Sequence, residues 1–360
     1  MIIVGDIASA NRKCSDDLKN IFLKHSHIFR GKSLICNLEG LVCDDFKLTA
    51  EVPILFNHSS VLEALKSANL KAVALANNHT LDLPACFEST VHHLTENEIA
   101  FAGAGESYEQ AAAPLVLEDE GRSVVVYNFC WDFLLYHQRN PSKQVYVAEI
   151  REQILISTVA KYRSENPNHS IVVYLHWSFD LETLPFPMYR KFAKDLVDAG
   201  TNVVVGCHSH CVQGGEKHGN GYIVYGLGNF FLPYKTFANG RLTFPDFARI
   251  QLALEWNPAT NVARCHWFEY ENRNDRHFLK FISSEEFASS KMLSRFSPFE
   301  ELSDRQYINF FKLKRRKRFL VPVYRDYHSV WLNYFYTAFL KKRGQVARTL
   351  AKMKIRKWQN

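Results

Sequence analysis

A series of short, continuous apolar runs constrains the fold of this chain more than any other feature of its sequence. The runs begin at Ile2, Leu34, Ala72, Val124, Ile171, Val203 and Tyr222, and each ends in a polar or glycine-rich cluster. Continuous rather than alternating apolarity is typical of strands that are buried on both faces. Segments with helical periodicity, such as 61–66 and 191–197, separate most of the runs. The sequence therefore predicts an α/β fold with a layered sheet flanked by helices.

The pattern changes towards the C-terminus. Residues 249–255 and 262–270 alternate between apolar and polar positions, and residues 257–261 between them are typical of a turn. This pattern predicts a β-hairpin at a sheet edge. We predict three regions: an α/β domain over 1–270, an irregular or helical extension over 271–311, and a basic amphipathic tail over 312–360.

The charge of the chain is concentrated in that tail. Residues 312–360 hold fifteen Lys and Arg against the single acid Asp326, a net charge of +14, so the other 311 residues carry −7 within the whole-chain +7. A mildly acidic body argues against nucleic acid as a partner. Basic clusters on either side of the aromatic stretch 331–339 indicate a helix at an anionic membrane surface, with a solvated helical face as the alternative. We expect the tail to lie apart from the candidate site.

Cysteine usage and hydropathy bear on the cellular compartment. The cysteines at positions 14, 36, 43, 86, 130, 207, 211 and 265 form no C-x-x-C pair and no disulfide framework, which indicates reduced thiols. No apolar run reaches the ~18 residues that a bilayer span needs. Met1 leads directly into an apolar strand without room for a secretory signal. We expect a cytoplasmic protein, held at the inner face of the membrane if the tail binds lipid.

Polar side chains of one chemical kind follow the apolar runs. They are Asp6, Glu39, Asn78, His79, His176, His208 and His210. Ligands of open α/β sheets bind outside the carboxyl ends of the strands, so these side chains are expected to meet at one edge. Carboxylates, a carboxamide and imidazoles suit a pair of divalent ions such as Mn, Fe or Zn. Two ions ~3.5–4 Å apart can activate water for a phosphoryl displacement, so the set predicts metal-assisted hydrolysis.

Each of these residues also has a structural interpretation. The alternatives are a turn or loop start at Asp6 and at Glu39, a helix cap within 77–79, and a satisfied core position for His176. His208 and His210 favour the metal site more strongly, because two imidazoles after a buried strand are costly without partners or a metal. Cys207 and Cys211 flank this pair, but strand alternation points their thiols away from the imidazoles, so we expect them to be packing residues.

Six short strings occur in a fixed order along the first 235 residues. They are 5–7, 37–40, 76–82, 176–177, 206–213 and 225–230. In these strings the chain resembles the CapA-like capsule synthesis proteins, which are associated with poly-γ-glutamate and exopolysaccharide production. The fold of that family is related to the calcineurin-like metallophosphoesterases. The resemblance implies a metallophosphoesterase-like β-sheet core flanked by helices, to which this chain adds a basic, mainly helical C-terminal extension.

The resemblance also implies roles for individual residues. Asp6 and Glu39 would bind metal, one of them as a bridge; Asn78, His176 and His208 would serve one ion, and His210 the other. His79 would protonate the leaving oxygen, with Asp82 orienting its ring. Ser178 and Asp180 stand where the family commonly has glycine and glutamate. The 225–230 string is a structural signature to which we assign no chemistry.

These observations predict a metal-dependent, phosphoesterase-like hydrolase that acts in capsule, exopolysaccharide or poly-γ-glutamate biosynthesis, with surface-polymer synthesis enzymes as partners. The alternative is a non-catalytic, membrane-associated assembly factor whose metal site is structural. Nucleic-acid processing through the same fold and the basic tail is a third hypothesis.

Overall fold

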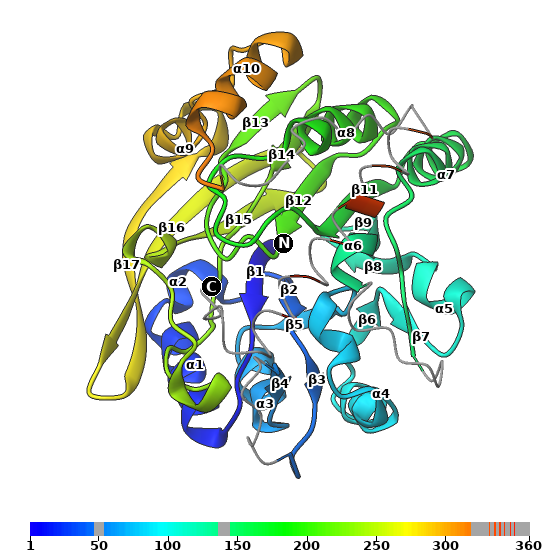
Figure 1. Cartoon of the computed structure of the whole chain (residues 1–360). Helices are drawn as coiled ribbons and strands as arrows, with labels where there is room; N and C mark the ends of the chain where they lie inside the picture. The colour runs from blue at the N-terminus through cyan, green and yellow to red at the C-terminus, as the bar shows by residue number, and fades with distance from the viewer. Residues whose placement is uncertain are drawn as a thin grey trace.

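The computed structural model describes residues 1–46, 54–135 and 145–317, together with scattered residues between 331 and 349. Two large β-sheets pack face to face at its centre (Figure 1). The first sheet has the spatial order β17 (Arg276–Glu286), β16 (Val262–Arg273), β15 (Ile250–Asn257), β1 (Ile2–Ile7), β2 (Leu34–Leu38), β5 (Leu70–Ala74) and β6 (Ala100–Ala102). The second has the order β13 (Gly215–His218), β14 (Gly221–Val224), β12 (Val203–Cys207), β11 (Ser170–His176), β9 (Arg122–Cys130) and β8 (Leu115–Asp119).

The central strands of both sheets are parallel. β1, β2, β5 and β6 run parallel in the first sheet, and β9, β11, β12 and β14 run parallel in the second. Two small sheets complete the strands, one of β3 (Leu41–Val42) with β4 (Phe56–Asn57) and one of β7 (Ala104–Gly105) with β10 (Tyr146–Val147). Parallel strands end on the same side, so the loops after them gather at one end of the molecule.

Helices cover the outer face of each sheet. Against the first lie α1 (Arg12–Lys24), α2 (Ser26–Phe29), α3 (Ser60–Lys66) and α4 (Phe87–Glu96). Against the second lie α5 (Tyr108–Ala112), α7 (Glu152–Glu165), α8 (Pro187–Asp198) and α10 (Asp304–Lys314). The short helices α6 (Asp132–Leu135) and α9 (Lys291–Phe296) follow β9 and β17. In Figure 1, α1, α3 and α4 lie on one side of the sheets and α7 and α8 on the other.

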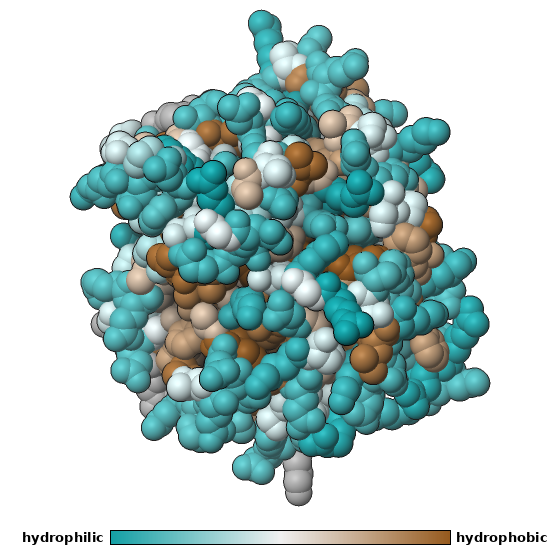
Figure 2. Space-filling view, turned by 180° about the vertical axis from the view of Figure 1, so that it is seen from behind, coloured by the Kyte–Doolittle hydropathy of each residue, from teal (hydrophilic) through white to brown (hydrophobic). Residues whose placement is uncertain are grey.

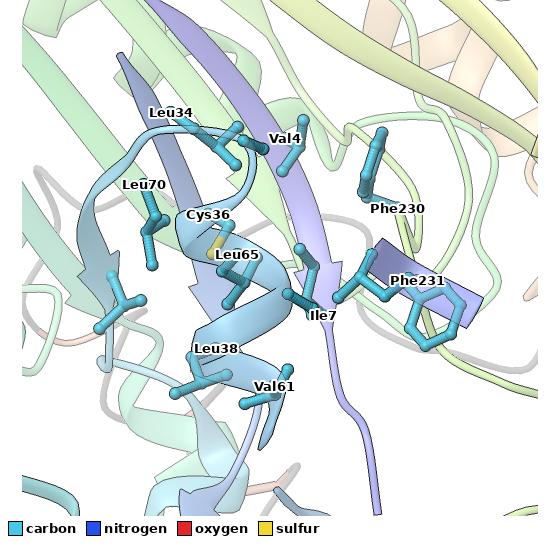
Figure 3. Close-up of a cluster of buried hydrophobic side chains, with 14 of the residues drawn as sticks. Val4, Ile7, Leu34, Cys36, Leu38, Val61, Leu65, Leu70, Phe230 and Phe231 are labelled. Carbon is cyan, nitrogen blue, oxygen red and sulfur yellow. The ribbon is translucent and has the colours of Figure 1, made fainter. Parts of the chain in front are cut away.

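Each central strand is buried on both faces, which explains the continuous apolar runs. Val4 of β1 packs in the cluster under the outer helices, whereas Ile3 packs in the cluster between the two sheets. Val61 and Leu65 of α3 point towards β2 in Figure 3. Full burial of such a side chain contributes about 1.5–3 kcal/mol. The Tyr174 hydroxyl of β11 donates to a carbonyl oxygen of β1 and links the sheets directly. The predicted α/β fold class is confirmed.

The segment 271–311 requires a correction. The prediction is an irregular or helical segment, but residues 271–273 continue β16, and β17 is an eleven-residue strand that pairs antiparallel with β16. The predicted hairpin is present as β15 and β16, yet β17 and not this hairpin forms the sheet edge. An edge strand buries only alternate residues: Leu279 is fully buried, whereas Phe278 and Ile282 are 38% and 39% exposed. The sequence of β17 therefore lacks the continuous apolar run that identifies the buried central strands.

The expectation of reduced cysteines is wrong for one pair. Cys43, at the end of the β3 segment, forms a disulfide with Cys86, the last residue of the short helix η2 (Pro84–Cys86). The other six cysteines are free and buried. Forty-three residues separate the paired cysteines, so only the tertiary fold brings them together. The bond closes a loop that contains the candidate residues Asn78, His79 and Asp82.

A buried ion pair fixes the C-terminal segment to the second sheet. The Arg190 guanidinium of α8 donates to both carboxylate oxygens of Glu216 on β13, at 2.8 Å each. It also donates to the carbonyl oxygens of Leu302 and Phe299 and lies 4.9 Å from the Tyr307 ring centre. The segment before α10 and α10 itself are therefore part of the folded core.

The face of the molecule seen in Figure 2 is mostly polar. Figure 2 shows the face opposite to that of Figure 1, on which hydrophobic side chains form a few separate patches within a hydrophilic surface. Scattered exposure of this kind is ordinary in folded proteins. Within the described ranges, no helix is both long enough and apolar enough to cross a membrane.

Candidate metal centre

The predicted site residues lie at the carboxyl ends of five parallel strands. Asp6 is on β1, Glu39 follows β2, Asn78 lies in η1 (Asn78–Leu81) after β5, His176 ends β11, and His208 and His210 follow β12. Three of these strands belong to the first sheet and two to the second. The site is therefore formed where two facing sheets end together, and not along the edge of one sheet as expected. All of these residues except Asn78 are buried.

Two groups of ligand atoms share Glu39. In the first group, His176 Nδ1 lies 3.9 Å from Asp6 Oδ1, and His176 Nε2 lies 3.8 Å from Glu39 Oε1. In the second, Glu39 lies with His208 and His210. Within each group all ligand atoms are within 4.8 Å of one another. Glu39 is therefore the residue that the two groups have in common.

Several buried polar atoms of the site have no hydrogen-bond partner among the residues that the structure describes. They are both carboxylate oxygens of Glu39, Nδ1 of His176 and Nδ1 of His208. Buried polar atoms without partners are rare because each costs free energy of desolvation. Carboxylate oxygens and imidazole nitrogens are ligands of borderline divalent ions. The residues of this site therefore fit a divalent metal.

The electrostatics of the site are consistent with metal ligation. Burial, reinforced by the charge of Asp6, raises the pKa of Glu39 to about 7. Burial and the neighbouring imidazoles hold the pKa values of His176 and His208 well below the ordinary value, so both rings are neutral, the form that binds metals. Burial lowers the pKa of His210, but Glu39 and Asp6 outweigh it and raise the value to about 10. The two carboxylates thus attract positive charge into the site.

Three asparagines orient the ligands. Two of them, Asn37 and Asn77, lie in strings in which other residues were predicted to be ligands. Asn37 Nδ2 donates to Asp6 Oδ1 at 2.7 Å, and Asn77 Nδ2 donates to Asn37 Oδ1 at 3.2 Å. Asn229 Oδ1 lies 2.6 Å from His210 Nδ1. If Nδ1 donates in this bond, Nε2 of His210 is the nitrogen available to a metal. Asn229 lies in the 225–230 string, to which no chemistry was assigned.

The helix-cap interpretation of residues 77–79 holds for the first asparagine alone. Asn77 Oδ1 accepts hydrogen bonds from the backbone N–H groups of His79 and Thr80, so Asn77 caps η1. Asn78 Oδ1 instead lies 2.7 Å from His176 Nε2, inside the site. Asn77 therefore stabilises the local backbone, whereas the adjacent Asn78 belongs to the candidate site.

His79 faces the site without belonging to either ligand group. Its Nδ1 lies 2.6 Å from Asp82 Oδ2, and its Nε2 lies 3.9 Å from Glu39 Oε1. Burial acts to lower the pKa of His79, but Asp82 and Glu39 raise it above the ordinary value overall. An imidazole with a raised pKa beside a metal centre is suited to donate a proton.

Unusual backbone geometry places the two histidines that follow β12. His208 and His210 have φ angles of 84° and 52°, in the left-handed region that non-glycine residues rarely adopt. Each such residue costs about 1–3 kcal/mol and is typical of functional sites. The preceding Gly206 is required for a different reason, because a Cβ there would lie 2.0 Å from the Tyr225 carbonyl oxygen.

The two cysteines that flank the histidines contribute to packing. The thiol of Cys207 lies 3.4 Å from the Tyr174 hydroxyl, and the thiol of Cys211 donates to the Glu182 carbonyl oxygen at 3.3 Å. Neither belongs to the ligand groups. Their expected role as packing residues is confirmed.

The start of the basic tail is folded against the loop after β11, next to the site and contrary to expectation, because the backbone N–H of Lys317 donates to Glu182 at 2.8 Å. Burial raises the pKa of Asp180, while the charges of His210 and Lys317 oppose that rise. The charge of Lys317 also contributes to the low pKa of His208. The folded segment before α10 returns the chain to the strand ends, which no local pattern in the tail indicates. Most of the tail after Lys317 lies outside the described residues.

Comparison with known proteins identifies the family. The family model described as "Bacterial capsule synthesis protein PGA_cap" matches residues 1–234. The chain belongs to this family. The resemblance indicated by the six ordered strings is therefore confirmed. The match ends before β15, so β15 to β17, α9 and α10 lie outside it.

Two curated relatives show the extent of the similarity. The chain is 27% identical over 199 residues to the capsule biosynthesis protein CapA of Bacillus anthracis, covering 54% of this chain and 47% of the relative. It is 26% identical over 214 residues to the PGA biosynthesis protein CapA of Bacillus subtilis, covering 58% of this chain and 53% of the relative. The chain thus spans about half the length of these curated relatives.

Among solved structures, similarity extends to the NAD nucleotidase of Haemophilus influenzae. The TM-score is 0.41 at 11% sequence identity, with 79% of this chain and 54% of that chain covered. A similarity this low says nothing about activity.

Proposed function

We propose that this PGA_cap family protein is a metal-dependent hydrolase of the phosphoesterase kind, acting in capsule, exopolysaccharide or poly-γ-glutamate synthesis. Family membership supports the biosynthetic context. The observation that carries the hydrolase proposal is Glu39, whose two buried oxygens lack partners in the described structure. Glu39 belongs both to the ligand group with His208 and His210 and to the group with Asp6 and His176. A carboxylate in that position suits two ions, and two ions suit phosphoryl chemistry.

The metal-holding residues would be Asp6, Glu39, Asn78, His176, His208 and His210. Ions such as Mn, Fe or Zn at this site would polarise a phosphoryl oxygen and make water a stronger nucleophile at neutral pH. Asn37 and Asn229 hold the side chains of Asp6 and His210 in place.

His79 would supply the proton that the leaving oxygen needs. Asp82 accepts the hydrogen bond from Nδ1 and so directs Nε2 towards the centre. The neighbouring carboxylates of Asp82 and Glu39, which raise the pKa of His79, favour the protonated ring. This arrangement separates proton donation from metal ligation, because His79 belongs to neither ligand group.

Turnover tests the proposed hydrolase. Protein supplied with Mn²⁺ should hydrolyse p-nitrophenyl phosphate, because the centre supports phosphoryl transfer to water. Chelation should abolish the activity and renewed Mn²⁺ should restore it, as measured by release of p-nitrophenol. Metal-loaded protein without turnover of this ester or of the corresponding diester would contradict the proposal. That result would favour the non-catalytic assembly factor, whose metal site is structural.

The 312–360 tail supports a second, separable part of the proposal, which is binding to an anionic membrane surface. The described residues between 331 and 349 are helical. Trp331, Phe339 and Val346 are 75%, 49% and 53% exposed. On a helix of 3.6 residues per turn these three positions fall within an arc of about 80°. An exposed apolar stripe within a segment of net charge +14 matches an interfacial helix beside anionic lipid. Membrane-bound surface-polymer synthesis enzymes would then be its neighbours and partners.

The membrane proposal predicts salt-sensitive sedimentation with vesicles. Full-length protein should sediment with phosphatidylserine-containing vesicles at low salt and be released as the Debye length falls from ~10 Å at 0.1 M to ~3 Å at 1 M. A variant lacking residues 318–360 should stay in the supernatant while keeping its metal. Vesicles of phosphatidylcholine alone are the control. If full-length protein stays in the supernatant with anionic vesicles at low salt, the membrane proposal is wrong and the tail is a solvated helix.

A further inference from the structure

A buried carboxylate holds the chain that follows α10. Glu182, which lies in the loop after β11, is 1% exposed. Its Oε1 accepts the backbone N–H of Arg316 at 3.1 Å, and its Oε2 accepts the backbone N–H of Lys317 at 2.8 Å. Oε1 also accepts the N–H groups of Thr183 and Leu184. We refer to residues 315–317 as the basic segment. The carboxylate fixes the backbone of this segment.

The loop that carries Glu182 is itself tied to the metal-binding loop. The Glu182 carbonyl oxygen accepts a hydrogen bond from Gln213 Nε2 at 2.7 Å, and the Leu181 N–H donates to the Ser209 carbonyl oxygen at 2.8 Å. Ser209 lies between His208 and His210. The basic segment is therefore attached to a loop that is bonded directly to the backbone between two candidate ligands.

The side chains of the basic segment bring positive charge to the site. The Arg316 guanidinium lies 3.9 Å from the ring centre of Phe247, a cation–π contact that orients it. Lys317 is half-buried, and the hydrogen bonds of Lys317 to Glu182 and of Leu181 to Ser209 hold its backbone beside the loop that carries His208 and His210. Among the residues described in 1–46, 54–135 and 145–317, no carboxylate forms an ion pair with Lys317, so its ammonium can pair with an anionic ligand.

We propose that Arg316 and Lys317 bind the anionic group of the substrate at the candidate metal centre, so that a segment beyond the family-matched residues 1–234 completes the site. The inference rests on the proposed function and deepens it, since it names the residues that would bind the anionic group of a phosphoester substrate. An anion that approaches Asp6 and Glu39 is repelled by both carboxylates, and cations at the edge of the site offset this repulsion. Charge-assisted hydrogen bonds to phosphate are among the stronger ones in proteins.

Binding of inorganic phosphate tests this inference without requiring turnover. Isothermal titration of Mn²⁺-loaded, full-length protein with phosphate should give a dissociation constant that rises roughly tenfold in Lys317→Ala, the loss expected for one charged hydrogen bond. Lys314→Ala is the matched control, because Lys314 is an exposed lysine three residues earlier at the end of α10. The control should bind phosphate as the wild type does. Lys317→Arg, which keeps the charge, should recover most of the affinity.

The kinetic counterpart is a rise in KM for p-nitrophenyl phosphate in Lys317→Ala with kcat changed far less, and with unchanged metal content. Equal phosphate affinity in wild type and Lys317→Ala overturns the inference. Equal losses in Lys317→Ala and Lys314→Ala also overturn it, because they would reflect the general charge of the tail. Phosphate binding that depends on Lys317 in a protein without turnover supports the inference while the proposed hydrolase function fails, so the two failures are distinguishable.

Discussion

Replacing His208 and His210 together by alanine should remove the metal from the protein. Wild type purified without chelators should carry about one to two equivalents of transition metal, because Glu39, His176 and His208 present buried ligand atoms without other partners among the described residues. The double variant removes two imidazoles from the group that shares Glu39. Its metal content should therefore fall to near zero, as measured by elemental analysis of protein of known concentration.

A matched variant controls for the loss of two histidines. His92→Ala plus His93→Ala removes the same number of imidazoles from α4, away from the centre. This control should keep its metal, and circular dichroism should show that both double variants remain folded. Equal, near-zero metal in wild type and in the His208 and His210 variant, after purification under native conditions, would eliminate the proposed centre.

Replacing His79 by alanine should abolish most of the hydrolysis while leaving the metal in place. A proton donor contributes ~10²–10⁴-fold to rate, and His79 lies outside both ligand groups. Turnover of phenyl phosphate, whose leaving group needs protonation, should fall by roughly that factor, whereas elemental analysis should give the wild-type metal content. Asp82→Asn should cause a smaller loss, because Asp82 acts through the His79 ring that it orients.

Two outcomes would refute this assignment of His79. Loss of metal in His79→Ala would show that the residue is a ligand and not the donor. Turnover of phenyl phosphate within about threefold of wild type, with metal retained, would show that protonation of the leaving oxygen does not depend on His79. p-Nitrophenyl phosphate should show a smaller loss, because p-nitrophenolate leaves without much assistance.

The architecture explains why the candidate ligands converge. The two sheets face each other, and a Tyr174 hydrogen bond links β11 to β1 across the interface. A Cβ at Gly5 would lie 1.9 Å from the Gly228 carbonyl oxygen, so glycine allows β1 to lie against the loop that carries Asn229. Loops from strands far apart in the chain thereby meet at one buried point. The Cys43–Cys86 disulfide and the basic segment add two further long-range constraints around it.

The sequence alone determined the parts of this protein that depend on local burial. Central strands that are covered on both sides must be apolar at every position, so their runs are visible without a structure. A charged or imidazole side chain at the end of such a run stands out for the same reason, and Asp6, Glu39 and His176 were identified in this way. The ordered strings were sufficient to indicate the family that the comparison later identified.

Only the tertiary structure shows the features that depend on contacts between residues far apart in the sequence. The two-sheet arrangement, β17 at the edge and the pairing of Cys43 with Cys86 leave little or no local pattern. The approach of Lys317 to the site depends on Glu182, a residue 135 positions earlier in the chain. A hydrogen bond between backbone N–H and a distant carboxylate selects for no particular side chain at position 317. For that physical reason the charge of the basic segment is visible in the sequence, whereas only the fold shows that its backbone is held beside the loop that carries His208 and His210.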